Sequence, residues 1–165
     1  MAFIELSYDK SKKLFAIPVI LSRNKRTSSL KTETLHKQKL MYVDTGSSRT
    51  SIVDSDAVEL EINVGNLPKE DVSGIGGITQ LPVSNEITIT LLDSQRLPVS
   101  IQLEKVTIFS SLVKRKIERN KGVYKERGYT QGKMVNIFGL DSLELLKSEL
   151  IINMKEKKGR VELIE

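Results

Sequence analysis

The sequence predicts a mainly β domain, a small β-barrel-like lobe with one C-terminal helix. Many short apolar or alternating segments indicate strands, and only one segment, late in the chain, has a clear helical pattern. Hydrophobic residues make up 39% of the chain and charged residues 28%, which is typical of a globular domain with a core. No internal repeat stands out, so we expect residues 1–165 to form a single domain.

The first half of the chain contains three predicted strands. Residues 13–21 are rich in apolar side chains, and residues 37–43 suit a hairpin partner that leads into a polar loop. Residues 51–53 continue after that loop as a short strand. Residues 57–62 suit either a short helix or a turn.

The second half contains further strands and the helix. Residues 86–91 alternate between apolar and polar side chains, as do residues 99–106, so each run predicts one strand. Residues 141–150 predict the helix, with Asp141 or Ser142 as its cap and three leucines on one face: Leu143, Leu146 and Leu150. The chain ends in two apolar runs around a Lys-Gly turn, which predicts a terminal hairpin.

The most informative motif is Asp44-Thr45-Gly46-Ser47, which follows an apolar segment. Peptide hydrolysis without a metal or a covalent intermediate needs a base to activate water and an acid to protonate the carbonyl oxygen. Two carboxyl groups about 3 Å apart share one proton and divide these roles, and Asp44 can supply one of them. Gly46 lets its backbone N–H approach the carboxylate. The hydroxyl of Thr45 can hold the loop, and that of Ser47 or Ser48 can donate to the outer carboxylate oxygen.

The same four residues also suit an ordinary tight turn, but two later segments favour the catalytic interpretation. Residues 72–78 place three glycines around one isoleucine, which predicts a mobile hairpin tip. Residues 136–143 place two apolar residues before a glycine and a helical segment. This pattern predicts a strand that ends where two backbones approach closely.

In these motifs, their order and their approximate spacing, the chain resembles the retropepsin family, the retroviral-type aspartic proteases. The similarity spans residues 12–109 and 134–164. The segments that carry it are Asp44-Thr45-Gly46-Ser47, Ser51-Ile52-Val53, Gly74-Ile75-Gly76-Gly77 and Ile137-Phe138-Gly139-Leu140-Asp141. The resemblance implies a single-lobe retropepsin-like acid protease β-barrel that hydrolyses peptide bonds.

The resemblance also assigns roles to residues. It makes Asp44 the catalytic acid/base and Thr45 a residue that hydrogen-bonds across a dimer axis. The hairpin residues Gly74, Ile75, Gly76 and Gly77 are implied to close over the substrate. The residues implied to pack behind the catalytic loop are Ile137, Phe138 and Gly139.

Two positions depart from the viral members of the family. Viral members usually carry Arg after the last glycine, where this chain has Leu140, so the viral inter-subunit ion pairs are not expected here. Ser47 stands where Ala is common in viral enzymes. The Gly-Leu-Asp sequence is more similar to the cellular, prokaryotic-type relatives.

The catalytic motif occurs once, and 165 residues suit one lobe rather than two. The second carboxyl must then come from Asp44 of another copy across a two-fold axis. The sequence therefore predicts a homodimeric aspartic endopeptidase that acts on polypeptide substrates.

Composition limits the other possibilities. The chain has no cysteine and a single histidine, His36, in a polar stretch, so we expect no metal site and no cofactor. The lack of cysteine favours a cytoplasmic protein. No apolar run approaches the length of a membrane span, and the first residues lack the pattern of a secretory signal.

Positive charge is concentrated in two segments that look like insertions. Residues 23–39 carry a net charge of +5 and residues 110–133 a net charge of +6, which leaves −6 for the rest of the chain. These segments suit solvated loops, contacts with nucleic acid or another anionic partner, or sites of self-cleavage. An alternative function is therefore a catalytically silent or autoinhibited dimerisation or binding module that contacts an anionic partner.

Overall fold

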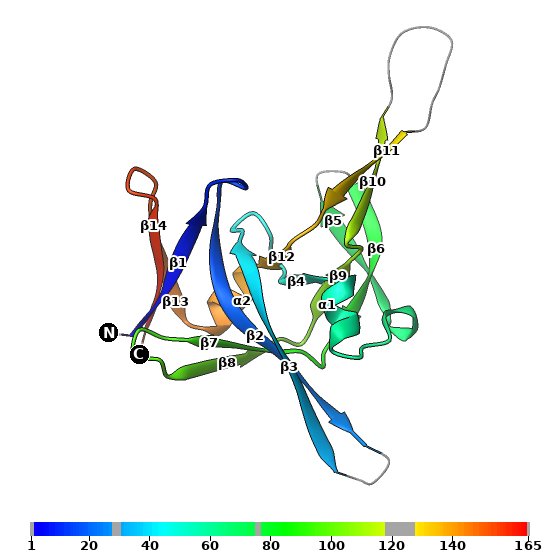
Figure 1. Cartoon of the computed structure of the whole chain (residues 1–165), viewed down its shortest axis with the longest axis horizontal. Coiled ribbons are helices and arrows are strands. Elements are labelled where there is room, and N and C mark those ends of the chain that lie inside the picture. The colour runs from blue at the N-terminus through cyan, green and yellow to red at the C-terminus, as the bar shows by residue number, and fades with distance from the viewer. Residues whose placement is uncertain (1, 28–30, 75–76, 118–127, 165) are drawn as a thin grey trace, which may run out of the picture.

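The computed structural model describes residues 2–27, 31–74, 77–117 and 128–164 (Figure 1). Most of the described strands belong to one large sheet. A separate antiparallel pair, β10 (Leu112–Ile117) and β11 (Gly128–Lys133), projects from the body. The predicted mainly β class is confirmed.

The large sheet is mixed, with antiparallel neighbours in the majority. Its described strands follow the order β13 (Ser148–Asn153), β14 (Lys158–Leu163), β1 (Phe3–Asp9), β2 (Leu14–Arg26), β3 (Thr32–Val43), β12 (Asn136–Phe138), β4 (Ser51–Val53), β9 (Val106–Phe109), β6 (Gly77–Ser84) and β5 (Lys69–Gly74). Strand β7 (Thr88–Leu92) pairs with β2, and β8 (Pro98–Gln102) pairs with β7. Because β13 and β5 lie at opposite ends of this order, the pairing of the described strands does not close the predicted barrel.

Short helical segments interrupt the strands. Within the described ranges they are the α-helices α1 (Asp54–Glu59) and α2 (Leu140–Leu145) and the 3-10 turn η1 (Val64–Asn66). The prediction of one helix was therefore wrong, because the segment left open between helix and turn contributes to α1. None of the helices in the described part has the length and hydropathy needed to cross a membrane.

The helix predicted over residues 141–150 is wrong in its second half. Helix α2 ends at Leu145, Lys147 adopts a positive φ of 46°, and the chain enters β13 at Ser148. Residue Leu150 faces the core from a strand rather than from a helix. The pairing of β13 with β14 determines this change, and such a tertiary contact overrides local helical propensity.

The strand predicted over residues 99–106 is two strands. Strand β8 ends at Gln102, and β9 begins at Val106 and pairs with β4 and β6 instead of β7. The intervening Leu103 is buried, so the chain keeps an apolar anchor where it changes neighbours. The alternation of apolar and polar residues in the sequence does not indicate that the chain changes its partner strands between β8 and β9.

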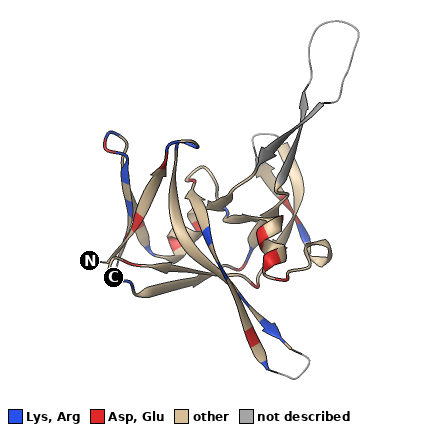
Figure 2. Ribbon diagram, viewed as in Figure 1, with Lys and Arg blue, Asp and Glu red and all other residues tan. Residues whose placement is uncertain are grey.

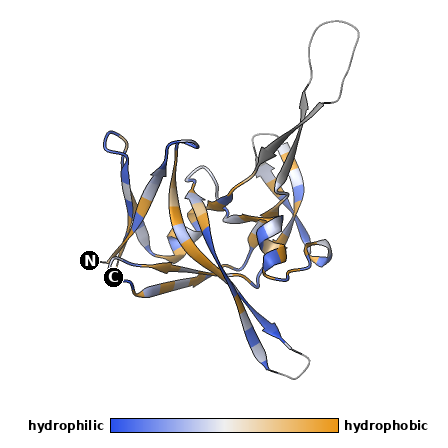
Figure 3. Ribbon diagram, in the orientation of Figure 1, coloured by the Kyte–Doolittle hydropathy of each residue, from blue (hydrophilic) through white to orange (hydrophobic). Residues whose placement is uncertain are grey.

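Three predicted hairpins are confirmed. Strands β2 and β3 pair from Ala16 opposite Tyr42 to Arg26 opposite Thr32, β5 pairs with β6, and β13 pairs with β14. The first hairpin is longer than predicted and projects from the body as an arm. Figure 3 shows hydrophobic residues on β2 and β3 within the body and hydrophilic residues on the arm.

The core lies beneath the strands that flank the Asp44 loop. Several of its side chains are completely buried, including Ile17, Leu21, Met41, Ile52, Ile89 and Phe138. Burying a large apolar side chain contributes about 1.5–3 kcal/mol relative to leaving it exposed. The ends of β3, β4 and β12 are therefore held by a common apolar cluster.

Candidate active site

The Asp44 loop crosses over the end of β12. Strand β3 enters the loop and β4 leaves it, and β12 lies between them, parallel to β3 and antiparallel to β4. The Asp44 N–H donates to the Phe138 carbonyl at 3.2 Å, and the Leu140 N–H donates to the Ser47 carbonyl at 2.9 Å. Two segments far apart in sequence thus fix the loop from behind.

Gly139 permits this crossing. A Cβ at this position would lie 2.5 Å from the Arg49 carbonyl carbon and 2.8 Å from the Thr50 nitrogen. Both atoms belong to the backbone, so the steric clash could not be relieved by the rotation of a flexible side chain. The close backbone approach predicted at the end of this strand is thus present, and it lies directly against the Asp44 loop.

The Asp44 carboxylate is half-buried and accepts a hydrogen bond within its own loop. The Gly46 N–H donates to Asp44 Oδ1 at 2.9 Å, and a Cβ on Gly46 would lie 3.1 Å from that oxygen. The loop therefore orients the Asp44 side chain through its own backbone.

The two hydroxyl residues of the motif, Thr45 and Ser47, have different surroundings. The Ser47 hydroxyl donates to the Arg49 carbonyl at 2.7 Å, so of the two predicted donors to the carboxylate, Ser47 or Ser48, Ser47 has a different partner. This contact closes the turn of the loop instead. Thr45 is exposed and lines a groove of about 490 Å³ with apolar residues that include Leu140, Leu143, Leu150 and Ile164.

A buried polar cluster fastens the other end of the loop. Thr50 donates its N–H to Asp141 Oδ2 at 3.0 Å and its hydroxyl to Asp141 Oδ1 at 2.6 Å. The Thr50 hydroxyl also accepts the Gly139 N–H at 3.0 Å and lies 2.5 Å from the Ser142 hydroxyl. Thr50 and Ser142 are completely buried, so these contacts replace water for every donor involved.

Sequence reasoning missed this cluster. It assigned Asp141 or Ser142 to capping the helix, but the N-cap of α2 is Gly139, with no hydrogen bond from a capping side chain. The available signal was the presence of several polar residues beside apolar strand ends, at Thr50 and at Asp141. Only the crossing of β12 behind the loop brings the two segments together.

The Asp44 loop and the β5–β6 hairpin line one cleft of about 650 Å³. Asp44, Gly46 and Ser47 form one wall, and the hairpin contributes Asp71, Val72, Ser73, Gly77, Thr79 and Leu81. Gly74 pairs with Gly77 next to the hairpin tip, and Gly77 has a φ of 105°, which a residue with a side chain rarely adopts. The predicted tip residues Ile75 and Gly76 lie outside the described residues.

The predicted supporting residues lie behind this cleft. Ile137 pairs with Tyr42 and with Ser51, which joins β12 to both flanking strands. Phe138 is completely buried in the core. The structure thus brings Asp44, Gly46, Ile137, Phe138 and Gly139 together around one loop.

Acidic partners pair with three of the six basic residues in the first basic segment: Arg23, Lys25 and Lys39. Lys39 pairs with Asp56 at 2.7 Å and with Glu59 at 3.0 Å. Burial lowers the pKa of Lys39, but the hydrogen bonds and charges of these carboxylates outweigh burial and raise the pKa. Figure 2 shows acidic bands on α1 near the basic band on β3.

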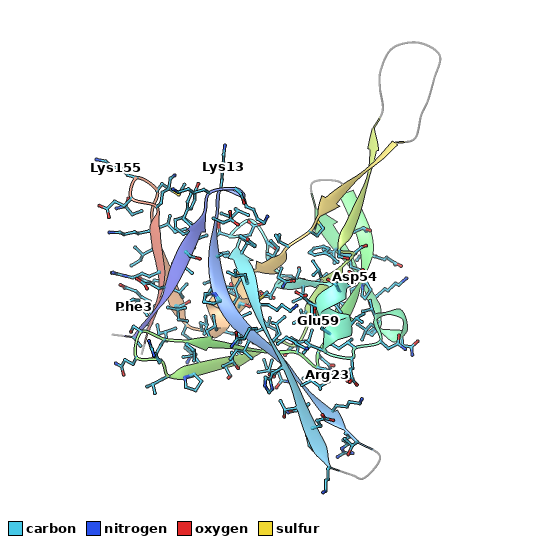
Figure 4. The ribbon with its side chains drawn as sticks, in the orientation of Figure 1. Phe3, Lys13, Arg23, Asp54, Glu59 and Lys155 are labelled. Carbon is cyan, nitrogen blue, oxygen red and sulfur yellow. The ribbon has the colours of Figure 1, made fainter. Side chains whose placement is uncertain are left out.

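The base of the β2–β3 arm is paired in the same way. Arg23 pairs with Glu86 at 2.7 Å and donates to the Glu61 carbonyl at 2.6 Å, and Lys25 pairs with the Glu61 carboxylate. Figure 4 shows Arg23 below the helix that carries Glu59. The charges of Arg23 and Lys25 are therefore engaged within the chain. In the second basic segment, residues 118–127 lie outside the described residues.

Comparison with known proteins gives the fold but no sequence relative. No model of a known protein family matches the chain, and no curated protein matches it in sequence. Among solved structures it is similar to a retropepsin-like aspartic protease from Rickettsia conorii, with a TM-score of 0.54 and 12% sequence identity. The match covers 98% of this chain and 91% of that protein. The chain therefore has the fold of a retropepsin-like aspartic protease.

Proposed function

We propose that the chain is a homodimeric aspartic endopeptidase that hydrolyses polypeptides through water activated by two Asp44 side chains. The observation that carries this proposal is the cleft that Asp44 shares with the β5–β6 hairpin. An ordinary turn would not need a carboxylate facing a cleft, with its backbone fixed from behind by Gly139. The fold shared with a retropepsin-like aspartic protease supports the same conclusion.

The chemistry needs two carboxyl groups that share one proton. The ionised Asp44 of one subunit, which accepts the Gly46 N–H, takes a proton from the water as it attacks the peptide carbonyl. The protonated Asp44 of the second subunit donates to the carbonyl oxygen. Collapse of the tetrahedral intermediate then transfers a proton to the leaving amine. The two carboxyl groups exchange roles, so no metal or cofactor takes part.

A surface beside Asp44 suits the second copy. Thr45 follows Asp44 directly and lines the apolar groove with Leu140 and Ile164. Ile164 is 50% exposed and Leu140 37% exposed, although both are large apolar residues. Covering this groove with an identical subunit removes apolar surface from water and brings the two Asp44 loops toward each other.

The cleft suits an extended peptide. Strand β5 is the last strand of the sheet order, so its outer backbone groups are available to a peptide that adds as a further strand. In this proposal the hairpin residues Gly74, Ile75, Gly76 and Gly77 close over the substrate and exclude water. Leu81 and Phe109 give the cleft apolar walls, which favour apolar substrate side chains.

The alternative, a silent or autoinhibited module that binds an anionic partner, has less support. Three basic residues of the first segment, Arg23, Lys25 and Lys39, are already paired with carboxylates of the same chain. A partner would have to compete with these ion pairs. The hairpin of β10 and β11 remains as a candidate contact for such a partner.

Replacing Asp44 tests the proposal directly. We expect Asp44→Asn to abolish cleavage of an unfolded protein substrate between pH 4 and pH 7, because an amide cannot act as the base. Asp93→Asn is the matched control, since Asp93 holds a turn between β7 and β8 and lies outside the cleft. Equal cleavage by wild type and Asp44→Asn, or no cleavage by a dimeric wild type, would reject the protease function.

A further inference from the structure

The β5–β6 hairpin has few backbone connections to the rest of the described chain. Its ladder to the body consists of Val83 opposite Thr107 and Ser84 opposite Val106. One further backbone hydrogen bond, from the Val83 N–H to the Pro68 carbonyl at 2.9 Å, joins the two strands at the base. The part of the hairpin that lines the cleft lies beyond these contacts, so side chains have to set its position.

One side chain of the hairpin joins it to two other elements. The Glu70 carboxylate lies on β5, next to the cleft residue Asp71, and is half-buried. Its Oε2 accepts a hydrogen bond from Arg49 at 3.0 Å, and its Oε1 pairs with Lys105 at 2.7 Å. Each carboxylate oxygen therefore has its own cation.

The two cations come from elements with different roles. Arg49 belongs to the Asp44 loop, and its carbonyl accepts the Ser47 hydroxyl that closes the turn of the loop. Lys105 directly precedes β9, the strand that joins the hairpin to the body. Glu70 therefore links the hairpin to the Asp44 loop and, at the same time, to the body.

We propose that Glu70 is a positioning residue that sets the hairpin against the Asp44 loop through its simultaneous ion pairs with Arg49 and Lys105. This inference rests on the proposed function where it concerns catalysis. The distance between the hairpin and the Asp44 loop sets the position of a bound peptide relative to the carboxylates. Small displacements of reacting groups reduce turnover strongly. The link is long-range in sequence, since 21 residues separate Arg49 from Glu70.

The link persists under acidic conditions. The hydrogen bond from Lys105 and then that from Arg49 lower the pKa of Glu70 below the ordinary value of 4.5. Because the folded-state pKa is depressed, the ion pairs are complete above pH 4.5 and are lost only as the pH falls through the lower value.

Glu70→Gln tests the proposal with two readouts. We expect it to lower kcat/KM by about tenfold, through kcat more than KM, because the peptide is held less well against the carboxylates. We also expect faster amide hydrogen exchange in residues 69–74 and 77–82, with the β1–β14 pair unchanged as a check of folding. Glu70→Asp, which keeps the charge, should recover part of both effects.

The matched control is Glu61→Gln, which removes the ion pair with Lys25 away from the cleft. If Glu70→Gln and Glu61→Gln have equal kcat/KM values and equal exchange in the hairpin, the positioning role is wrong. The exchange readout does not need activity. An inactive wild type with faster hairpin exchange in Glu70→Gln would reject the protease function and retain the link.

Discussion

Single residues decide whether the Asp44 loop can form. Gly139 is the clearest case, because the backbone of Arg49 and Thr50 occupies the space that a side chain would need. Its N–H is also used, since it donates to the buried Thr50 hydroxyl. The glycine therefore serves a packing requirement and does not provide flexibility.

We expect Gly139→Ala to lower the free energy of unfolding by about 3 kcal/mol or more, since backbone atoms must move to admit the methyl group. Gly65→Ala is the control, because its Cβ would meet only Asn63 Oδ1 at 3.5 Å, an ordinary contact. Urea denaturation of both variants measures the difference. Equal stability of the two variants would contradict the close approach at Gly139.

At this scale the sequence predicted residues whose roles depend on short segments. Asp44 with Gly46, and the glycine at 139, are local motifs whose chemistry can be read directly from neighbouring residues. The partner of Ser47 was wrong, because the hydroxyl reaches a carbonyl of its own loop as easily as the carboxylate. The Thr50–Asp141 contact was missed because it joins residues 91 positions apart.

At the scale of elements, the β5–β6 hairpin carries the clearest conformational requirement. Gly77 begins β6 with a φ of 105°, and a Cβ there would meet no atom within 4 Å. A side chain at position 77 would therefore have enough space, but the backbone angle φ is one that residues with a side chain rarely adopt. A residue with a side chain would change the course of the hairpin at the edge of the cleft.

We expect Gly77→Ala to cost about 1–2 kcal/mol of local conformational strain, which displaces the hairpin and reduces kcat more than it lowers Tm. Peptidase assays and thermal melts on the same preparation measure the two effects. A drop in Tm of several degrees with unchanged kcat would contradict a role for this hairpin in turnover.

Elements were predicted well where a local pattern was sufficient. The β2–β3 and β13–β14 hairpins follow from neighbouring apolar runs, and the β5–β6 hairpin follows from the glycines at its tip. Helix α2 was extended too far, because Leu143, Leu146 and Leu150 share a helical spacing although Leu150 belongs to β13. Pairing with β14, the next strand along the chain, decided this segment.

For the whole molecule, the proposed activity depends on self-association. The groove between Thr45 and Ile164 begins at the residue after Asp44, and four of its lining residues are large and apolar: Leu140, Leu143, Leu150 and Ile164. One subunit holds one copy of the Asp44 motif. Activity should therefore follow the dimer concentration.

We expect Ile164→Glu to shift the protein to a monomer and to reduce specific activity at least about tenfold at micromolar concentration, because a charge would be buried in an apolar interface. Val58→Glu is the control, since Val58 is 63% exposed on α1 and lies outside the groove. Sedimentation and activity at several concentrations measure the effect. A dimeric, fully active Ile164→Glu would place the interface elsewhere.

The order of strands also has a consequence for synthesis of the protein. Strand β12 supports the Asp44 loop from late in the sequence. Gly139, which follows β12 and contacts Thr50, lies 89 residues after Thr50. A ribosome-bound chain thus presents the Asp-Thr-Gly motif long before its scaffold has been translated, and such long-range closure is slow. Until residues 136–139 emerge, the nascent Asp44 loop therefore lacks the backbone contacts that fix it in the folded protein.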